Sequence, residues 1–381
     1  MNQNTFCSLP FTEIFLGPNG DVKPCCSACI SLGNLNESSI QEILQNHRSH
    51  QLRQSIIDGV WDPSCRQCQR QAEQGVAAER AGDPEEFIKK HGPITKEFFK
   101  LERLDLRWSN TCNLSCTYCY EYFSSKWAEI KGIKINDIKD ENENSLMLLI
   151  EEHKDSVENI MLLGGEPLLQ KQNFNLTELL SGKTFYILSN LAVALENNKV
   201  AQRLLKEPSL QFGVSFETVK DRYEYVRHGA KWEIFDSNLD YIHNLRPNMN
   251  IDAHSLYSIY SAFNLVEFYQ YLTDKNMFNS VFWNLLESSG ENNHASVFKL
   301  TTPLKQIALE EITRCIELFP TAPGIENLKG IRQSLIDNMQ TPVPKNIDFI
   351  NEAIVVESKL KKEPGKHFSD LWPDLYERLI K

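Results

Sequence analysis

The sequence predicts an α/β protein built around a partial (β/α)6, TIM-like barrel at residues 100–290. A small cysteine-rich domain at residues 1–75 precedes the barrel, and a helical extension at residues 291–381 follows it. Two observations support this expectation. Short apolar segments alternate with helical segments throughout the barrel region, which indicates parallel strands joined by helical crossovers. Six of the ten cysteines lie between Cys7 and Cys68, before that alternation begins.

The cysteine-rich region carries secondary-structure signals of its own. TEIFLGPNGDVKP (12–24) predicts two short strands around a Pro-Asn-Gly-Asp turn, a pattern typical of a hairpin. Residues 39–59 place apolar residues at helical spacing and end in glycine, so a helix is expected there. Residues 76–99 are polar and contain Gly-Asp-Pro and Gly-Pro breaks, which predicts a linker to the barrel.

Six strands are expected in the barrel region, each a short apolar run. They are LERLDLRW (101–108), ENIMLLGG (158–165), TFYILSN (184–190), LQFGVSF (210–216), NIDAHSLY (250–257) and SVFWNLLE (280–287). Helical segments such as SLMLLIEEHK (145–154) and SAFNLVEFYQYLTDK (261–275) lie between them. Because there are six such units, the sequence predicts an open barrel rather than a closed barrel of eight strands.

Charge and hydropathy argue against several classes of protein. The net charge of −11 argues against nucleic-acid binding, which rests on lysine and arginine contacts to phosphate. No stretch approaches the roughly 20 apolar residues of a membrane span. The opening MNQNTFCSLPFTEIF lacks the basic start and apolar run of a signal peptide, so a cytoplasmic protein is expected. Thiols stay reduced in the cytoplasm, where clustered cysteines indicate metal binding or catalysis.

A second group of cysteines lies in the loop after the first expected barrel strand. TCNLSCTYCY (111–120) places Cys112, Cys116 and Cys119 four and three residues apart. In parallel barrels the chemistry lies at the C-terminal ends of the strands. Three thiolates can bind three irons of a four-iron, four-sulfur cluster and leave the fourth iron open to another ligand. A zinc ion is the alternative, but it would need a further ligand from elsewhere.

These motifs resemble those of a known enzyme family. CNLSCTYCY is similar to the CxxxCxxC motif of the radical S-adenosylmethionine (radical SAM) enzymes, with Tyr118 as the aromatic residue before the last cysteine. GGEP (164–167), at the end of the next expected strand, resembles the family's second motif. The resemblance implies a [4Fe-4S] cluster that binds SAM, and an electron donor such as flavodoxin or ferredoxin. It also implies reductive cleavage of SAM to a 5′-deoxyadenosyl radical, which abstracts a hydrogen atom from the substrate.

The resemblance also implies which residues contact SAM. Gly164 and Gly165 would let the backbone approach the SAM amino group, and Glu166 would supply a carboxylate for it. The alternative for GGEP is an ordinary strand-to-helix turn with Pro167 in its first helical turn. Further implied contacts are Tyr118, Pro167, Ser189, Asn190, Ser215, Glu217 and Arg227, with a solvated surface arginine as the alternative for Arg227. The segments ILSN and VSFE depart from the commoner Thr-Asn-Gly and Ser-x-Asp forms.

The amino-terminal cysteines resemble a second known module. Cys7, Gly20 and Cys25 are similar to the Cx9–15Gx4C start of SPASM and twitch domains, which bind auxiliary iron–sulfur clusters in many radical SAM enzymes. With Cys65 and Cys68, this resemblance implies one auxiliary [4Fe-4S] cluster on four cysteines. In the better-known members the module follows the barrel, whereas here it precedes it.

Three cysteines are left outside both sets. Cys26 and Cys29 are surplus to the auxiliary set, and Cys315, in a helical segment, is expected to be a small buried hydrophobe. The alternative for the amino-terminal region is a zinc site on Cys26, Cys29, Cys65 and Cys68, because paired CxxC motifs are ordinary zinc ligands.

We therefore expect a radical SAM enzyme whose substrate is a peptide, because family members with this module often modify ribosomally made peptides. A small metabolite or nucleotide-derived molecule is the second substrate class. A non-catalytic zinc-binding interaction protein on a barrel scaffold is the alternative from another class. SAM cleavage after anaerobic reconstitution would distinguish an enzyme from a scaffold, and a short open reading frame beside the gene would indicate a peptide substrate.

Overall fold

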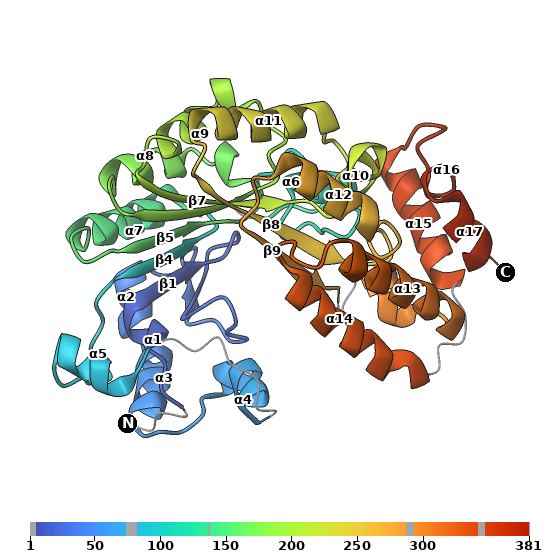
Figure 1. The fold of residues 1–381 in the computed structure, drawn as a ribbon. Coiled ribbons are helices and arrows are strands. Elements are labelled where there is room, and N and C mark those ends of the chain that lie inside the picture. The colour runs from blue at the N-terminus through green and yellow to red at the C-terminus, as the bar shows by residue number, and fades with distance from the viewer. Residues whose placement is uncertain (1–4, 74–81, 136–137, 287–292, 342–346, 381) are drawn as a thin grey trace. The chain divides into compact units, whose positions relative to one another are not determined.

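The structure, a computed structural model, describes residues 5–73, 82–135, 138–286, 293–341 and 347–380. The chain forms two compact units, each assembled from several segments (Figure 1). The first unit contains residues 1–111, 135–187 and 199–210, and the second contains residues 112–134, 188–198 and 211–381. No helix in the described ranges is both long and apolar enough to cross a membrane.

In the first unit the amino-terminal hairpin joins the parallel strands that follow it. The strands are β1 (Glu13–Leu16), β2 (Asp21–Lys23), β3 (Gly33–Asn34), β4 (Arg103–Leu106), β5 (Asn159–Leu162) and β6 (Thr184–Ser189, whose last two residues belong to the second unit), in the order β3-β2-β1-β4-β5-β6. Strand β1 is antiparallel to β2, which confirms the predicted hairpin. Strand β1 also pairs in parallel with β4, so that Glu13 lies opposite Arg103 and Leu16 opposite Leu106. The cysteine-rich region thus extends the sheet of the barrel region.

Alternating apolar and charged residues along β4 explain how the first unit packs. Leu104 and Leu106 of β4 are 0–1% exposed, as are Ile160 and Leu162 of the parallel neighbour β5. Burying one such side chain stabilises the fold by about 1.5–3 kcal/mol. The alternate residues of β4, Arg103 and Asp105, are charged instead, and they pair with Glu13 of β1 and with Arg107. One face of this sheet therefore forms the core, and the other carries ion pairs.

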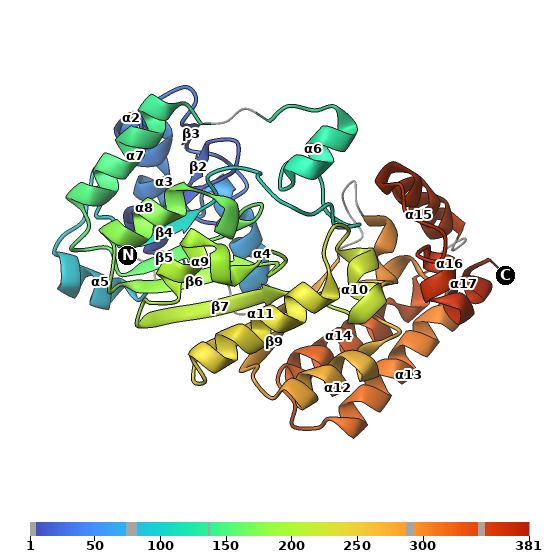
Figure 2. The ribbon, with the colours of Figure 1, turned by 90° about the horizontal axis from the view of Figure 1, so that it is seen from above.

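The helices of the first unit are α1 (Leu9–Thr12), α2 (Ile40–Gln45), α3 (His47–Ile57), α4 (Arg66–Glu73), α5 (Pro84–His91), α7 (Asp140–Glu152), α8 (Gln172–Leu179) and α9 (Lys199–Leu204). Single 3-10 turns lie at Pro63–Cys65 and Pro167–Leu169. Helix α2 begins with a capping box in which Ser39 and Glu42 satisfy each other's backbone N–H groups. It packs against α7, as Figure 2 shows.

The helical segment expected at residues 39–59 is divided in two by Asn46. This residue has extended backbone angles, ends α2, and caps α3 by accepting a hydrogen bond from the backbone N–H of Ser49. Helix α5 lies within residues 76–99, the segment predicted to be a linker, of which residues 76–81 lie outside the described ranges. The domain boundaries expected from the sequence stay a prediction.

The second unit contains the remaining strands and the carboxy-terminal helices. Strands β7 (Ser209–Ser215, whose first two residues belong to the first unit), β8 (Asn250–Tyr257) and β9 (Ser280–Leu285) are parallel neighbours. The helices are α6 (Ser125–Lys131), α10 (Lys220–Val226), α11 (Trp232–Leu245), α12 (Leu265–Lys275), α13 (Thr302–Leu318), α14 (Ile325–Asp337), α15 (Ile347–Leu360), α16 (Phe368–Leu371) and α17 (Pro373–Leu379). Short 3-10 turns lie at Leu195–Asn197, Asn293–Ala295, Val297–Lys299 and Asn338–Gln340.

The expected strands of the barrel region all form, as β4 to β9, with helices between them. The strand pairs within each unit in this region are parallel, which confirms the predicted α/β class. The carboxy-terminal extension is helical, as predicted, and its helices α13 and α14 lie side by side (Figure 1). Cys315 of α13 is 0% exposed, as the sequence predicted.

Candidate functional site: two cysteine centres

The loop that carries Cys112, Cys116 and Cys119 is fixed by the first turn of α6. Ser124, the residue that caps α6, donates a hydrogen bond to the Leu114 carbonyl at 2.7 Å. The indole Nε1 of Trp127 donates to the Cys116 carbonyl at 2.8 Å. Both bonds hold the loop through its backbone carbonyls. The Cys112 thiol accepts a further bond from the Leu114 N–H at 3.5 Å, and the Cys119 thiol donates to the Tyr120 carbonyl at 3.7 Å.

A second segment, at the end of α10, supports the same loop. The backbone N–H of Ser115 donates to the His228 carbonyl at 3.0 Å, and that of Thr117 donates to the Val226 carbonyl at 2.8 Å. Cys116 lies between these two bonded residues. The loop thus pairs along its length with residues 226–228.

An ion pair beside the loop brings together three of the predicted SAM-contact residues. Arg227 Nη2 lies 2.6 Å from Glu217 Oε2, and both side chains are buried, at 7% and 1% exposure. The Tyr118 hydroxyl donates to Glu217 at 3.2 Å, and the Arg227 guanidinium lies 5.8 Å from the centre of the Tyr118 ring. Arg227 is therefore not the solvated surface arginine that the sequence left open.

Burial and nearby charges together shift the pKa values of Arg227 and Cys116. Burial alone would lower the pKa of Arg227, but Glu217, Tyr118 and Cys116 raise it well above its usual value. Burial raises the pKa of Cys116 to about 11, and the nearby Arg227 partly offsets that shift. A fixed guanidinium beside a ligand thiol favours the thiolate, which is the form that binds metal.

Two amide side chains link the cysteine loop to the end of β6. Asn190 Nδ2 donates to Asn113 Oδ1 at 3.0 Å and lies 3.9 Å from Cys112 Sγ. Asn113 donates in turn to the Ala192 carbonyl at 3.1 Å. Ser189, also predicted as a SAM contact, accepts a hydrogen bond from the N–H of Leu191 at 3.0 Å. The predicted contact Ser215 is half-buried at the end of β7.

The carboxy-terminal extension also reaches the cysteine loop, which the sequence did not predict. Val356 and Leu360 of α15 form a buried cluster with Trp127 of α6, and Cys119 packs against this cluster. Lys362, just after α15, donates to the Tyr225 carbonyl at 2.8 Å. No local pattern marks these positions, because they lie more than 200 residues from the loop in sequence.

The GGEP turn belongs to the first unit. A Cβ at Gly165 would lie 2.2 Å from the Thr111 carbonyl oxygen, so only glycine fits this close approach. The Glu166 N–H donates to the same oxygen at 2.8 Å. Glu166 is fully buried and accepts from the Leu168 N–H at 3.1 Å, as the cap of the 3-10 turn that begins at Pro167. The motif thus forms the strand-to-helix turn that the sequence left open, and it docks on the residue before Cys112.

Glu166→Gln separates a SAM-binding role from a purely structural one. Glutamine keeps an acceptor for the Leu168 N–H, so the fold should be retained, but it removes the negative charge. If Glu166 holds the SAM ammonium group, loss of this charge-assisted bond should cost roughly 1.5–3 kcal/mol, which is about ten-fold to a hundred-fold in SAM affinity. Equilibrium binding of SAM to the reconstituted protein measures this effect.

Glu158→Gln is the matched control, because Glu158 is exposed just before the same strand, β5. Its SAM affinity should equal that of the wild type. If Glu166→Gln also leaves SAM affinity unchanged, GGEP is a turn and nothing more.

The amino-terminal cysteines share one cavity in the first unit. A cavity of about 220 Å³ is lined by Cys7, Cys25, Cys26, Cys65 and Cys68, and its other wall includes Glu13, Arg103, Asp105 and Met161 from β1, β4 and β5. Burial and the nearby Cys7 raise the pKa of Cys65 to about 12, and they raise that of Cys25 as well. All four cysteines of the expected auxiliary set therefore face the same space.

Gly20 explains the spacing between Cys7 and Cys25. It lies in the turn between β1 and β2 with φ at +88°, a conformation that favours glycine. A Cβ there would also lie 2.9 Å from Asn34 Oδ1. The glycine thus permits the tight hairpin that connects the two cysteine-bearing segments.

The Cys29 thiol contacts backbone carbonyls and does not line this cavity. It donates to the carbonyl oxygens of Pro63 and Ser64, at 3.3 and 3.5 Å. It is not among the residues that line the cavity, which disfavours a zinc site built from Cys26, Cys29, Cys65 and Cys68. None of the ten cysteines, all of them among the described residues, forms a disulfide.

The fit of an iron–sulfur cluster rests on the nature and the spacing of these thiols. In the described part of the chain, no three His, Cys, Asp or Glu side chains converge closely enough to hold a single metal ion. A cluster needs wider spacing, because each thiolate binds a different iron. Four thiols around one cavity match that requirement.

Two family models match segments of the chain that contain these cysteines. The family model of the radical SAM superfamily matches residues 106–257. The model of the SPASM iron–sulfur cluster-binding domain matches residues 7–69. No curated protein matches the chain.

Among solved structures, the chain is similar to Streptococcus suis SuiB bound to S-adenosylmethionine, at 15% identity over 74% of this chain and 61% of that chain, with a TM-score of 0.42. It is also similar to SuiB bound to the precursor peptide SuiA, at 16% identity over 72% and 62%, with a TM-score of 0.41. For anSMEcpe with bound AdoMet and Kp18Cys peptide, the identity is 19% over 56% and 58%, with a TM-score of 0.40. The chain spans about three fifths of the length of these proteins.

Both matched families bind iron–sulfur clusters, and the matched segments contain the two groups of cysteines described above. The SPASM match precedes the radical SAM match along the chain, in the order expected from the sequence. The chain therefore contains a radical SAM domain, matched over residues 106–257, and a SPASM iron–sulfur cluster-binding domain on its amino-terminal side, matched over residues 7–69.

Proposed function

We propose that this protein reductively cleaves SAM and uses the resulting 5′-deoxyadenosyl radical to abstract a hydrogen atom from a peptide. The observation that carries the proposal is the loop of Cys112, Cys116 and Cys119 within the radical SAM match. When bound there, a [4Fe-4S] cluster supplies the electron and an open iron for SAM. The three thiolates are its ligands in this proposal.

The surrounding residues of the chain orient and shield this site. Arg227, fixed by Glu217, keeps a permanent positive charge beside Cys116. Trp127, Val356 and Leu360 cover Cys119 with apolar side chains and so exclude water from that side of the loop. Asn190 and Asn113 hold the start of the loop beside Cys112. The proposal includes contacts between SAM and ten residues of the chain: Tyr118, Gly164, Gly165, Glu166, Pro167, Ser189, Asn190, Ser215, Glu217 and Arg227.

The second part of the proposal concerns the auxiliary cluster. Cys7, Cys25, Cys65 and Cys68, which line one cavity, are its four ligands. Four thiolates close the coordination of a cluster, so its role is electron transfer or structural support rather than SAM binding. The electron donor in this proposal is a small protein such as flavodoxin or ferredoxin, acting in the cytoplasm.

A peptide substrate is proposed because of the SPASM match, since radical SAM enzymes with this module often modify ribosomally made peptides. The test is to incubate the reduced enzyme and SAM with a deuterated peptide encoded by a short open reading frame beside the gene. Deuterium should appear in 5′-deoxyadenosine and the peptide mass should change. A peptide left unchanged by an enzyme that cleaves SAM would instead favour a small-molecule substrate.

A further inference from the structure

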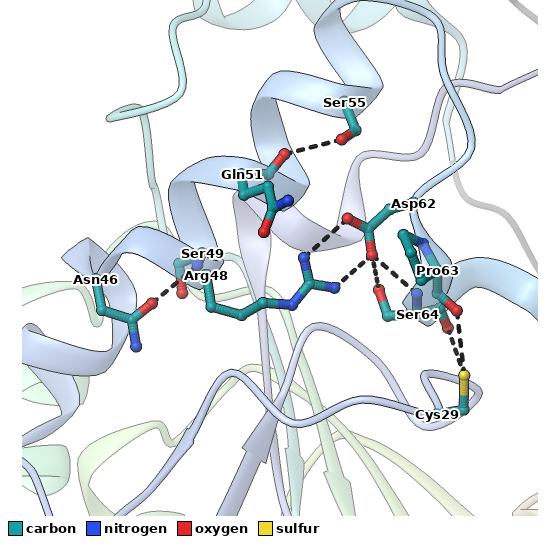
Figure 3. A network of polar contacts seen from close by, with 9 residues as sticks. All are labelled: Cys29, Asn46, Arg48, Ser49, Gln51, Ser55, Asp62, Pro63 and Ser64. Atoms are coloured by element: carbon teal, nitrogen blue, oxygen red, sulfur yellow. Dashed lines mark hydrogen bonds and ion pairs between the residues drawn. The ribbon is translucent and has the colours of Figure 1, made fainter.

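A bidentate ion pair lies at the start of the turn that carries Cys65, one of the proposed auxiliary ligands. Arg48 of α3 donates from both terminal nitrogens to the two carboxylate oxygens of Asp62, with Nη1 2.9 Å from Oδ2 (Figure 3). The Asp62 side chain is 1% exposed and that of Arg48 is 22% exposed. Removing either partner leaves the other with an unpaired charge, at a largely desolvated position in the case of Asp62.

Asp62 also builds the turn that carries Cys65. Its Oδ1 accepts a hydrogen bond from the Ser64 N–H at 2.8 Å and another from the Ser64 hydroxyl at 2.6 Å. It thereby caps the 3-10 turn Pro63–Cys65, and Ser64 itself is fully buried. The position of the Cys65 backbone is therefore set by the Asp62 carboxylate.

The Cys29 thiol holds the other side of the same turn. It donates to the carbonyls of Pro63 and Ser64 (Figure 3). The Cys29 N–H also donates to the Ser64 carbonyl, at 3.2 Å. The residues directly before Cys65 are thus held from two sides. Asp62, paired with Arg48, holds one side, and Cys29 holds the other. Besides its ion pair with Asp62, Arg48 interacts electrostatically with Cys65 and Cys29.

We propose that Arg48 is a positioning residue of the auxiliary cluster. It orients Cys65 through Asp62 and places a permanent positive charge near Cys65. Cys29, surplus to the ligand set, is in this view a structural thiol that holds the turn. This inference rests on the proposed assignment of the auxiliary cluster to Cys7, Cys25, Cys65 and Cys68. It adds two consequences, one for the geometry of the cluster and one for its reduction potential.

The potential should respond because reduction adds a negative charge to a cluster that its thiolates already make anionic. A guanidinium nearby stabilises that added charge, and charge and hydrogen bonding around the ligands are known to set cluster potentials. Loss of Arg48 should therefore shift the midpoint potential of the auxiliary cluster to a more negative value. Lysine keeps the charge but cannot make the two parallel bonds, so Arg48→Lys should preserve more of the potential than of the geometry.

The experiment uses the full chain with Cys112, Cys116 and Cys119 replaced by alanine, so that only the auxiliary cluster contributes a signal. After anaerobic reconstitution, iron content, the EPR spectrum of the reduced cluster and its midpoint potential are measured for Arg48→Met, Arg48→Lys and Asp62→Asn. Gln51→Ala is the matched control, because Gln51 lies one turn further along α3 and its side chain is exposed. Arg48→Met should lower the potential and change the EPR spectrum, while Gln51→Ala should match the parent.

Arg48 and Asp62 act through each other in this account, so the double variant Arg48→Met/Asp62→Asn should shift the potential no further than the larger single change. If Arg48→Met does not fold, Arg48→Lys and Asp62→Asn carry the test. A potential and spectrum identical to those of Gln51→Ala would overturn the inference and leave the auxiliary cluster in place. A parent protein without iron would overturn the cluster assignment itself, and the inference with it.

Discussion

Replacing Cys112, Cys116 and Cys119 together by alanine is expected to reduce iron from about eight to about four atoms per chain and to abolish SAM cleavage. The three thiols lie in one loop held by α6, whereas the auxiliary cysteines line a cavity of the first unit. Each cluster should therefore load independently of the other. Iron and sulfide analysis after anaerobic reconstitution, together with product analysis, measures both effects.

Cys315→Ala is the matched control for the variant in which Cys112, Cys116 and Cys119 are replaced by alanine, which we call the triad variant. Cys315 is buried in α13 and belongs to neither set, so its loss should leave about eight irons and full SAM cleavage. Replacing Cys65 and Cys68 should remove the other cluster instead, while some SAM cleavage survives. A triad variant that loses all its iron, or a wild type with zinc at the amino-terminal site, would show that the two-cluster assignment is wrong.

Arg227→Met is expected to destabilise the protein by about 3–5 kcal/mol, because it leaves Glu217 as an unpaired buried carboxylate. Glu217 is 2% exposed and also accepts the hydrogen bond from Tyr118 in the cysteine loop. The variant should consequently bind the SAM-binding cluster at Cys112, Cys116 and Cys119 poorly and cleave SAM slowly. Urea unfolding and iron content of the same preparations measure the two effects.

Two further variants show whether the ion pair is the cause. Lys329→Met removes an exposed partner from the Lys329–Glu326 pair, and should cost no more than about 1 kcal/mol. Arg227→Met combined with Glu217→Gln removes both charges, and should be less destabilised than Arg227→Met alone. If Arg227→Met is as stable as Lys329→Met and retains its iron, the ion pair does not support the loop.

Local patterns in the sequence were sufficient to predict much of the fold. The strands β4 to β9 are short apolar runs between helical segments, and this alternation predicts parallel strands joined by helical crossovers. The hairpin of β1 and β2 follows from its Pro-Asn-Gly-Asp turn. The break between α2 and α3 was missed, because an asparagine that caps one helix and ends another resembles an ordinary helical polar residue. Helix α5 was also missed, although Asp83-Pro84 and Gly92 are start and stop signals.

The parts of the site that could not be predicted depend on contacts between distant segments. The parallel pairing of β1 with β4 joins the amino-terminal module to the barrel strands across about ninety residues. The contact of Leu360 with Trp127 and the ion pair of Arg48 with Asp62 have no local signature either. The cysteine spacings predict the ligands, but only the folded chain shows that Cys29 lies outside the auxiliary cavity.

The most direct test of the central claim is the amount of 5′-deoxyadenosine formed by anaerobically reconstituted, chemically reduced wild-type protein supplied with SAM. The account predicts 5′-deoxyadenosine and methionine in equal amounts, formed even without substrate and at a slow rate. Triad variant protein in the same assay gives the background. The absence of 5′-deoxyadenosine above that background, from protein whose clusters are fully loaded and reducible, would contradict the claim that this chain is a radical SAM enzyme.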